Sequence, residues 1–308
     1  MKYRKIGKTG LESSVIGVGT WQFGGEWGKN FTQSEVDAIL DTAQEQGINL
    51  IDTAECYGDH LSESFIGDYL TRRNREDWIV ATKFGHHFIE NFERTRHWKP
   101  DEVLKQLDHS LKSLQTDYID LYQAHSCSDE EFDNDDLWTM LDKQVQAGKI
   151  RHLGISLRTN DDTFQTKAAS DIHAEAIQVV YNRLDRKPED TVFPLSEEQN
   201  LGVLARVPLA SGYLSGKYKP GVTFKKDDVR SRHNQQETEK LLRLVQEIEQ
   251  HEVPKDVPMS AWALAWCLKH PAVSVVIPGC KTPEQVISNA SAADLDMVSS
   301  DHPHHVNR

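Results

Sequence analysis

Short apolar runs alternate with stretches of helical periodicity along almost the whole chain, and this alternation limits most strongly how the chain can fold. The stretch 34–47 shows the helical kind, because apolar residues such as Val36, Ile39 and Ala43 recur on one helix face. Alternating strands and helices form parallel sheets, and eight such units favour a closed barrel over an open sheet. We therefore predict an α/β fold, a (β/α)8 barrel built as one domain from residues 1–308. The expected strands are 15–19, 48–52, 77–83, 117–125, 150–156, 176–182, 201–208 and 273–279.

A few segments lie outside this alternation. Residues 3–6 and 11–13 flank a Gly/Lys/Thr turn and predict a small N-terminal β-hairpin. Residues 86–98 and about 210–234 interrupt the pattern, and we expect two long loops of the kind that sets specificity on the active face of a barrel. The polar tail 299–308 is expected to be disordered.

Ionisable side chains stand at the ends of three consecutive expected strands. Asp52, Lys83 and His125 close these strands, and Tyr57 follows Asp52 by five residues. Because parallel barrel strands direct their C-terminal ends to one face, the four side chains are expected to meet. A lysine beside a tyrosine favours the phenolate and lowers the tyrosine pKa from about 10. A carboxylate would hold the lysine in place, and a histidine would orient a carbonyl oxygen. The set suits carbonyl reduction, with Tyr57 as proton donor.

Each of these residues taken alone has an ordinary structural role. A lone aspartate at a strand end is usually a cap or turn residue, and a lone tyrosine is usually a half-buried packing residue. A lone lysine or histidine is usually solvated or already satisfied by neighbours. The catalytic interpretation therefore depends on the ordered set rather than on any single member.

Three sequence segments resemble the catalytic segments of the aldo-keto reductases. They are IDTAECYG, ATKFG and DLYQAH, in the family's order and at similar spacing, and the resemblance extends from GVGTW near residue 20 to IPG near residue 280. It implies a (β/α)8 barrel plugged by the N-terminal hairpin. It also implies a catalytic tetrad of Asp52, Tyr57, Lys83 and His125. We further expect the wall of the substrate pocket to consist of Trp21, Trp27, Phe84 and His86.

The same resemblance implies a nicotinamide dinucleotide across the barrel mouth. GVGTWQFGG is not the usual dinucleotide fingerprint, because the third glycine of G-x-G-x-x-G is missing and no strand-turn-helix context follows. Thr20 and Trp21 are expected at the nicotinamide end, and Ser156 and Gln178 are expected to hold the carboxamide. Many relatives stack a Tyr or Trp on the nicotinamide, whereas this chain has Arg206 at the corresponding position.

Two further segments resemble the phosphate-binding parts of such a site. PLASGYLSGKY resembles the diphosphate loop, which implies contacts from Pro208, Leu209, Ser211 and Lys217. PGCKTPEQVISN places Lys281 just before an expected helix with Thr282 as N-cap and Pro283 at its first position, where an anion is favoured. Relatives use a basic residue there for the 2′-phosphate, so NADPH is expected over NADH. The expected cofactor residues of this part are Gly279, Lys281, Gln285, Asn289 and Arg230.

His86 and His87 could suggest a metal site. Two adjacent histidines point in different directions, however, and the sequence shows no evident third ligand. We therefore expect no metal.

Composition narrows the range of partners. Acidic residues outnumber basic ones by 48 to 35, and the formal net charge of −13 argues against nucleic-acid binding. No apolar run is long enough to span a bilayer, and the polar N-terminus lacks a signal-peptide core. The four cysteines show no CxxC spacing, which fits a reduced cytoplasmic protein. We expect a small carbonyl compound as partner and regard a monomer as plausible.

Two alternative functions stay open at this point. The first is a regulatory subunit that senses NADPH on the same fold and contacts a partner protein. The complete set of four catalytic residues favours an enzyme, but a subunit that senses NADPH could also contain it. The second is an unrelated barrel enzyme such as a lyase, which the fold alone would permit. The segment around Lys281 would then be unexplained.

Overall fold

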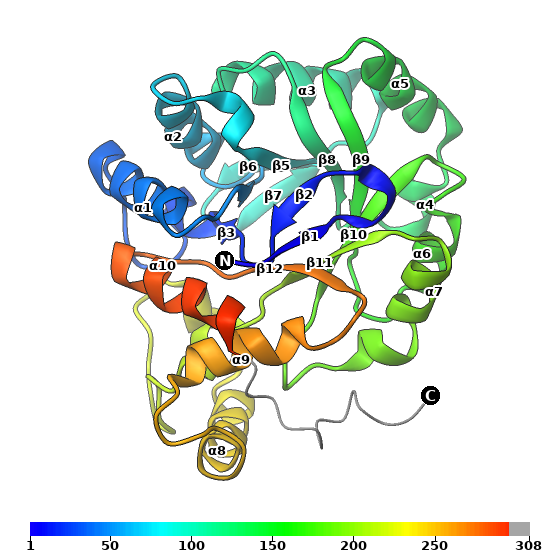
Figure 1. Ribbon diagram of the computed structural model, residues 1–308. Coiled ribbons are helices and arrows are strands. Elements are labelled where there is room, and N and C mark those ends of the chain that lie inside the picture. The colour runs from blue at the N-terminus through cyan, green and yellow to red at the C-terminus, as the bar shows by residue number, and fades with distance from the viewer. Residues whose placement is uncertain (296–308) are drawn as a thin grey trace.

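Eight parallel strands form a barrel with helices around it (Figure 1). The computed structural model describes residues 1–295, so the tail 299–308, for which we expected disorder, lies outside the described residues. The barrel strands in chain order are β3 (Val18–Gly19), β4 (Leu50–Asp52), β5 (Ile79–Phe84), β8 (Ile119–His125), β9 (Ile150–Ser156), β10 (Ala174–Val180), β11 (Gly202–Arg206) and β12 (Val273–Ile277). The predicted (β/α)8 fold is confirmed, whereas the prediction that residues 1–308 form one domain stays a prediction.

The first strand is shorter than the expected 15–19, because this segment divides its hydrogen bonds between two neighbours. Val18 and Gly19 pair with β4, while Ile16 forms a single bridge with Val276 of β12. A second bridge joins Gly19 to Gly279 just beyond β12. These two bridges connect the first and last strands of the sheet and close the barrel.

Helices follow the barrel strands as the alternation predicts. Helix α1 shows why: its buried residues Val36, Ile39 and Ala43 recur on one face. Its first turn carries a capping box, in which Thr32 accepts from the Glu35 amide and the Glu35 carboxylate accepts from the Thr32 amide. The helices are α1 (Gln33–Glu45), α2 (Leu61–Leu70), α3 (Pro100–Ser113), α4 (Asp129–Phe132), α5 (Asp135–Gln146), α6 (Thr163–Ala168), α7 (Val192–Glu198), α8 (Gln235–His251), α9 (Met259–Leu268) and α10 (Pro283–Ala290). None of the described helices is both long and apolar enough to span a membrane.

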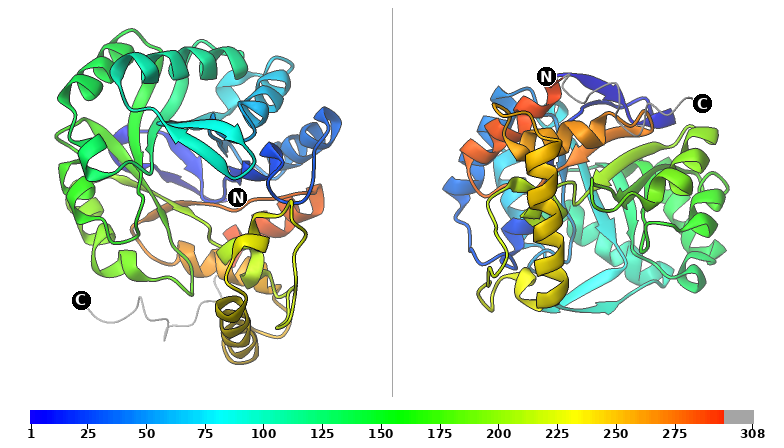
Figure 2. Two further views of the ribbon diagram at one scale, coloured as in Figure 1. Left: turned by 180° about the vertical axis from the view of Figure 1, so that it is seen from behind. Right: turned by 90° about the horizontal axis from the view of Figure 1, so that it is seen from below.

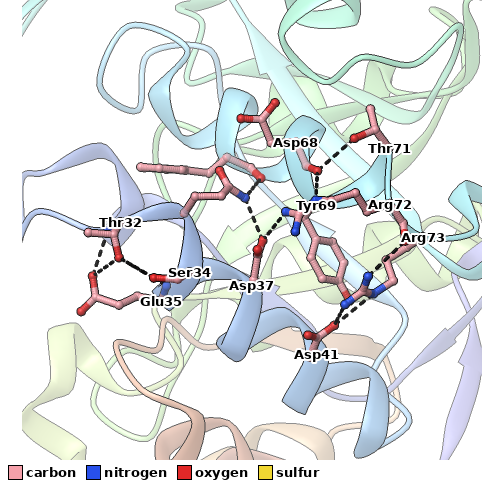
Figure 3. Close-up of polar contacts among 12 residues, drawn as sticks. Thr32, Ser34, Glu35, Asp37, Asp41, Asp68, Tyr69, Thr71, Arg72 and Arg73 are labelled. Atoms are coloured by element: carbon pink, nitrogen blue, oxygen red, sulfur yellow. Dashed lines mark hydrogen bonds and ion pairs between the residues drawn. The ribbon is translucent and has the colours of Figure 1, made fainter.

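Ion pairs join α1 to the turn that follows α2 (Figure 3). Arg72 lies 2.8 Å from Asp37, and Arg73 lies 2.6 Å from Asp41. All four side chains are partly exposed, so each pair contributes at most about 1 kcal/mol. These charges belong to the packing of the outer ring and not to the barrel mouth.

The N-terminal hairpin closes one end of the barrel, as predicted. Its strands β1 (Tyr3–Lys5) and β2 (Glu12–Ser14) are antiparallel and lie across the near end of the barrel in Figure 1. Ile6 is fully buried and joins the apolar cluster of inward-facing strand residues. The hairpin approaches β11 so closely that a Cβ on Gly202 would lie 2.2 Å from the Ile6 side chain. Glycine is therefore required there for the plug to fit.

The segment 86–98 differs from the expected loop, because it forms a second hairpin. Strands β6 (His86–Glu90) and β7 (Glu93–Arg96) pair antiparallel, and Figure 2 shows them at the barrel end opposite the N-terminal hairpin. Side chains of β7 fix the hairpin to the barrel, because Arg94 pairs with Glu26 and Arg96 pairs with Glu131. The segment 210–234 contains two short 3₁₀ helices, at Ala210–Ser215 and Val229–Arg232.

Candidate active site

A cavity of about 500 Å3 opens at the C-terminal ends of the barrel strands. Its lining comes from strand ends and from the segments that follow them, which are the usual positions of active-site residues in this fold. Most of the predicted cofactor and pocket residues contribute to it. Those that line the cavity are Thr20, Trp21, Trp27, His86, Gln178, Pro208, Leu209, Ser211, Lys217, Arg230, Gly279, Lys281, Gln285 and Asn289.

The predicted catalytic residues come together at the floor of this cavity. Lys83 Nζ lies 2.7 Å from Asp52 Oδ1 and 3.4 Å from the Tyr57 hydroxyl, and it also donates to the Thr53 carbonyl at 2.7 Å. The ring centroid of His125 lies 6.2 Å from that of Tyr57, with the planes nearly perpendicular. Asp52 and Lys83 are buried, and Asp52, Tyr57 and His125 line the cavity.

The side-chain alternation of the strands produces this arrangement. In β5, Ile79 and Ala81 belong to the cluster inside the barrel, and Lys83 continues the same face one step further. In β4, Leu50 points inward and Asp52 follows it at the same spacing. Each strand therefore fills the barrel with apolar groups and then places one polar group at the mouth.

Two buried glutamines complete the surroundings of Asp52. Asp52 Oδ2 accepts from Gln178 Nε2 at 2.7 Å and from Gln123 Nε2 at 3.3 Å. Gln178 also donates to Gln123 at 3.1 Å and accepts from Ser156 at 3.4 Å. The carboxylate is thus held by donors from three strands, which fixes its position under Lys83.

Burial and charge act in opposite directions on the Tyr57–Lys83 pair. Burial raises the pKa of Tyr57, and the nearby Lys83 ammonium opposes this increase without overcoming it. For Lys83, burial disfavours the charge, but Asp52 and Tyr57 outweigh it and raise the pKa of the ammonium. The expectation that Lys83 lowers the Tyr57 pKa therefore describes only one contribution. The phenol stays protonated near neutral pH, and the lysine stays charged.

His125 is neutral in this environment. Burial lowers the pKa of His125 well below its usual value, and the neighbouring His86 and Lys83 lower it further. The His86 ring stacks on it with centroids 4.6 Å apart, and burial together with Arg96 lowers the pKa of His86 to about 4. A neutral imidazole retains one N–H donor, which is the form needed to hold a carbonyl oxygen.

Aromatic rings and one buried ion pair form the opposite wall. Trp21 stacks over Tyr57 at 6.0 Å and meets Trp27 edge to face at 5.1 Å. Glu26 is fully buried, and its Oε2 accepts from Trp21 Nε1 and from Arg94, each at 2.6 Å. The β6–β7 hairpin is thereby tied to the wall of the cavity.

The far end of the cavity gathers positive charge. Lys281 precedes α10, whose N-cap is Thr282 with Pro283 in the first turn, as predicted. Burial lowers the pKa of Lys281, and the nearby Arg230 lowers it further. Arg230 is paired with Asp228 at 2.5 Å. An anion in this region would relieve the repulsion between the two cations.

The structure places two of the predicted cofactor and pocket residues outside the lining of the cavity. Phe84 does not line the cavity: it is fully buried and packs on Tyr122 with ring centroids 4.8 Å apart. The strand alternation explains the difference, because the residue after inward-pointing Lys83 faces outward, toward the helices. Ser156 lies behind Gln178 and does not reach the cavity lining.

Sequence reasoning missed several residues of the site. Gln123 could have been found, because it stands two positions before His125 on the inward face of the same strand. Arg94, Gln22 and Tyr218 line the cavity from segments with no such periodic signal. Their positions depend on contacts between parts of the chain that are distant in sequence.

Glu55, outside the predicted catalytic set, contributes a pH-dependent stability to the protein. Its side chain is buried, and burial raises its pKa from 4.5 to about 8, partly opposed by His60. The pKa of such a carboxyl group is higher in the folded state than in the unfolded state. Its contribution to stability is complete at a pH below the unfolded-state pKa and is lost as the pH rises through the folded-state pKa. We expect the contribution of Glu55 to the free energy of unfolding to fall between about pH 4.5 and 8.

Urea denaturation of the wild type and of Glu55→Gln across this pH range would measure the effect. The variant should show a flatter profile, because its amide cannot ionise. Glu45→Gln, at an exposed position of α1, serves as the control and should retain the wild-type slope. Parallel profiles for the wild type and Glu55→Gln would contradict the assignment.

The fold and the site together define a (β/α)8 barrel with a cavity at the C-terminal ends of its strands, lined by aromatic and ionisable side chains. Comparison with known proteins agrees with this class. The model of the aldo/keto reductase family matches residues 15–304. The chain therefore belongs to the aldo/keto reductase family, whose members are oxidoreductases that use nicotinamide cofactors.

Individual relatives cover nearly the whole chain. It is 30% identical over 307 residues to the aldo-keto reductase YhdN of Bacillus subtilis, covering 98% of this chain and 91% of that protein. It is 29% identical to an NADH-specific methylglyoxal reductase of Escherichia coli, covering 98% of this chain and 96% of that protein. The holo form of aldo-keto reductase AKR11C1 from Bacillus halodurans superimposes with a TM-score of 0.82 at 30% identity, covering 99% of this chain and 95% of that one.

Proposed function

We propose that this protein is an NADPH-dependent reductase that converts aldehydes or ketones to alcohols, with Tyr57 as the proton donor. The observation that carries the proposal is the contact of Lys83 with both Asp52 and the Tyr57 hydroxyl at the cavity floor. A protonated phenol beside a permanent cation can release its proton to a substrate oxygen, because the phenolate formed is stabilised by the ammonium.

The residues around the cavity fit a dinucleotide cofactor. The lining provides a cationic end at Lys281 and Arg230 and a mouth bordered by Gly19 and Gly279. A Cβ at Gly279 would lie 1.9 Å from Gln22 Nε2, so this stretch keeps the backbone and the Gln22 amide in close contact. The bound cofactor would supply the hydride, and the protein would supply position and electrostatic field.

The protein side chains would then act on the carbonyl oxygen of the substrate. Neutral His125 would donate a hydrogen bond to that oxygen and orient it toward Tyr57. Tyr57 would transfer its hydroxyl proton to the developing alkoxide, while Lys83 would stabilise the resulting phenolate. Asp52 would keep Lys83 charged and in place, since it pairs with the ammonium at 2.7 Å. Trp21 and Trp27 would exclude water from one side of the reacting group.

The preference for NADPH is a separate part of the proposal. Family membership does not determine it, because one relative is named as an NADH-specific enzyme. The support comes from Lys281, whose ammonium is half-buried and donates to the Trp27 carbonyl, with Arg230 nearby. A phosphate dianion would compensate this charge, and an unphosphorylated ribose would not.

Lys281→Met is expected to weaken NADPH binding by about tenfold to a hundredfold, because it removes a charge-assisted contact worth about 1.5–3 kcal/mol. NADH binding should change far less, since NADH lacks the 2′-phosphate. Quenching of tryptophan fluorescence during titration with each coenzyme would measure both dissociation constants. Lys226→Met is the matched control. It removes the same charge from an exposed lysine that does not line the cavity. An equal loss for the two coenzymes would contradict a 2′-phosphate contact.

The setting we propose is the cytoplasm, with a small carbonyl compound as partner. The four cysteines, Cys56, Cys127, Cys267 and Cys280, are free and buried, which fits a reducing compartment. The test of the function is the oxidation of NADPH by the wild type in the presence of a reactive aromatic aldehyde. Tight NADPH binding without turnover on any carbonyl compound would instead favour the regulatory subunit.

A further inference from the structure

Cys56, His86 and His125 gather on one side of the cavity, from three different elements. Cys56 lies in the turn after β4, His86 begins β6 and His125 ends β8. One ligand atom from each of the three lies within 4.8 Å of the others. Cys56 Sγ is 3.7 Å from His125 Nδ1, and the two imidazole rings are stacked. The proposed proton transfer uses only His125 of this set.

This grouping has the ligand chemistry of a zinc site. Zinc binds thiolate sulfur at about 2.3 Å and imidazole nitrogen at about 2.0–2.1 Å, so tetrahedral ligand atoms lie roughly 3.3–3.6 Å apart. The ligand atoms lie up to 4.8 Å apart, and the His86 and His125 rings are stacked with an interplanar angle of 17°. One imidazole must therefore rotate about its side-chain bonds so that nitrogens of both rings face the ion. All three residues line the cavity, which leaves the fourth ligand position for water.

The surrounding charges are largely balanced, so they permit a dication. Three of the nearby cations are each paired with a carboxylate of their own. The pairs are Lys83 with Asp52, Arg94 with Glu26 and Arg96 with Glu131. The Arg206 guanidinium donates to the Leu157 carbonyl and adds positive charge near the site, which limits the affinity.

We propose that Cys56, His86 and His125 form a binding site for Zn2+ whose occupation blocks the cavity. Each ion bound displaces the thiol proton of Cys56, which leaves to solvent, and the two imidazoles bind through ring nitrogens. The ion occupies the space beside the Tyr57 ring and engages His125. Bound Zn2+ would therefore inhibit carbonyl reduction. Only this inhibition rests on the proposed function, and the binding of the metal does not.

Direct metal binding is tested with Co2+ as a spectroscopic probe for Zn2+. The experiment uses the full-length protein with His302, His304 and His305 each replaced by Gln. These three histidines lie close together in the sequence and could bind Co2+ themselves. We expect one equivalent of Co2+ to bind with a thiolate-to-cobalt charge-transfer band in the near ultraviolet, and Zn2+ to abolish this band. The band should vanish in Cys56→Ser, and His86→Gln should weaken binding at least about tenfold.

Matched neighbours supply the controls. His87→Gln alters the adjacent histidine, which faces His97 instead, and Cys127→Ser alters a second buried thiol that contacts Gln165. Both controls should retain the band and the affinity. Circular dichroism and thermal melting verify the folding of each variant, and His86→Gln tests the site independently if Cys56→Ser does not fold.

The outcomes separate the metal site from the proposed enzyme function. The absence of a thiolate band in the wild type, or unchanged Co2+ affinity in both Cys56→Ser and His86→Gln, would overturn the site. Loss of the band in Cys56→Ser together with retained binding in the controls would support it. A protein that binds Co2+ in this way but reduces no carbonyl compound would retain the site and lose the proposed function.

Discussion

Replacement of Tyr57 by phenylalanine is expected to lower kcat for carbonyl reduction by about 10²–10⁴-fold, the usual contribution of a positioned general acid. The substitution removes only the hydroxyl that lies 3.4 Å from Lys83 and retains the ring that stacks on Trp21. The coenzyme should therefore bind about as tightly as before, because its predicted contacts do not include that hydroxyl. Steady-state kinetics with an aromatic aldehyde, beside a fluorescence titration with NADPH, would measure both quantities.

The matched control for this result is Tyr218→Phe. Tyr218 also lines the cavity, but its hydroxyl accepts from Arg230 at 2.7 Å, at the cationic end rather than at the floor. This variant should affect coenzyme affinity more than kcat. A Tyr57→Phe enzyme that retains most of its kcat would show that the proton comes from another group, and the proposed mechanism would be wrong.

Lys83→Met is expected to destabilise the fold by about 3–5 kcal/mol, because it leaves the buried carboxylate of Asp52 without its cation. Both side chains of this pair are at most 5% exposed, so water cannot replace the lost partner. The Thr53 carbonyl loses a hydrogen bond in the same substitution. Urea denaturation at pH 7, followed by circular dichroism, would measure the change in the free energy of unfolding.

Two comparisons make the result specific to the buried pair. The double variant Lys83→Met/Asp52→Asn should recover part of the loss, since the amide is neutral and can still accept from Gln178. Lys149→Met removes a lysine whose ion pair with Asp108 is exposed to solvent, and it should cost at most about 1 kcal/mol. If the Lys83 and Lys149 variants lost the same small amount, Asp52 would not depend on Lys83 for its charge.

Much of the barrel could be predicted from the sequence, because its signals are local. Apolar runs and helical periodicity depend on near neighbours in the chain, and they predicted the strands, most of the helices and the N-terminal hairpin. The position of Lys83 at the end of an inward-facing row follows from the same strand periodicity. The resemblance of three segments to one family then directed attention to the residues that the cavity brings together.

Errors arose where orientation or pairing mattered more than pattern. Phe84 stands next to a predicted catalytic residue, yet the strand pleat turns it to the outer core. The sequence of segment 86–98 predicts a loop, yet the segment forms a hairpin, and Arg94 of this hairpin pairs with buried Glu26. The predicted strand 15–19 is reduced to Val18–Gly19, because it shares its hydrogen bonds with two neighbours.

The sequence by itself determined the order of strands and helices and the ionisable residues at the ends of three consecutive barrel strands. These features depend on patterns among residues that are close in the sequence, so they can be recognised without the tertiary structure. Only the tertiary structure decided which of the polar groups meet: Gln123 and Gln178 on Asp52, and His86 with Cys56 beside His125. Such meetings depend on barrel closure and strand register, which bring together groups from distant parts of the chain.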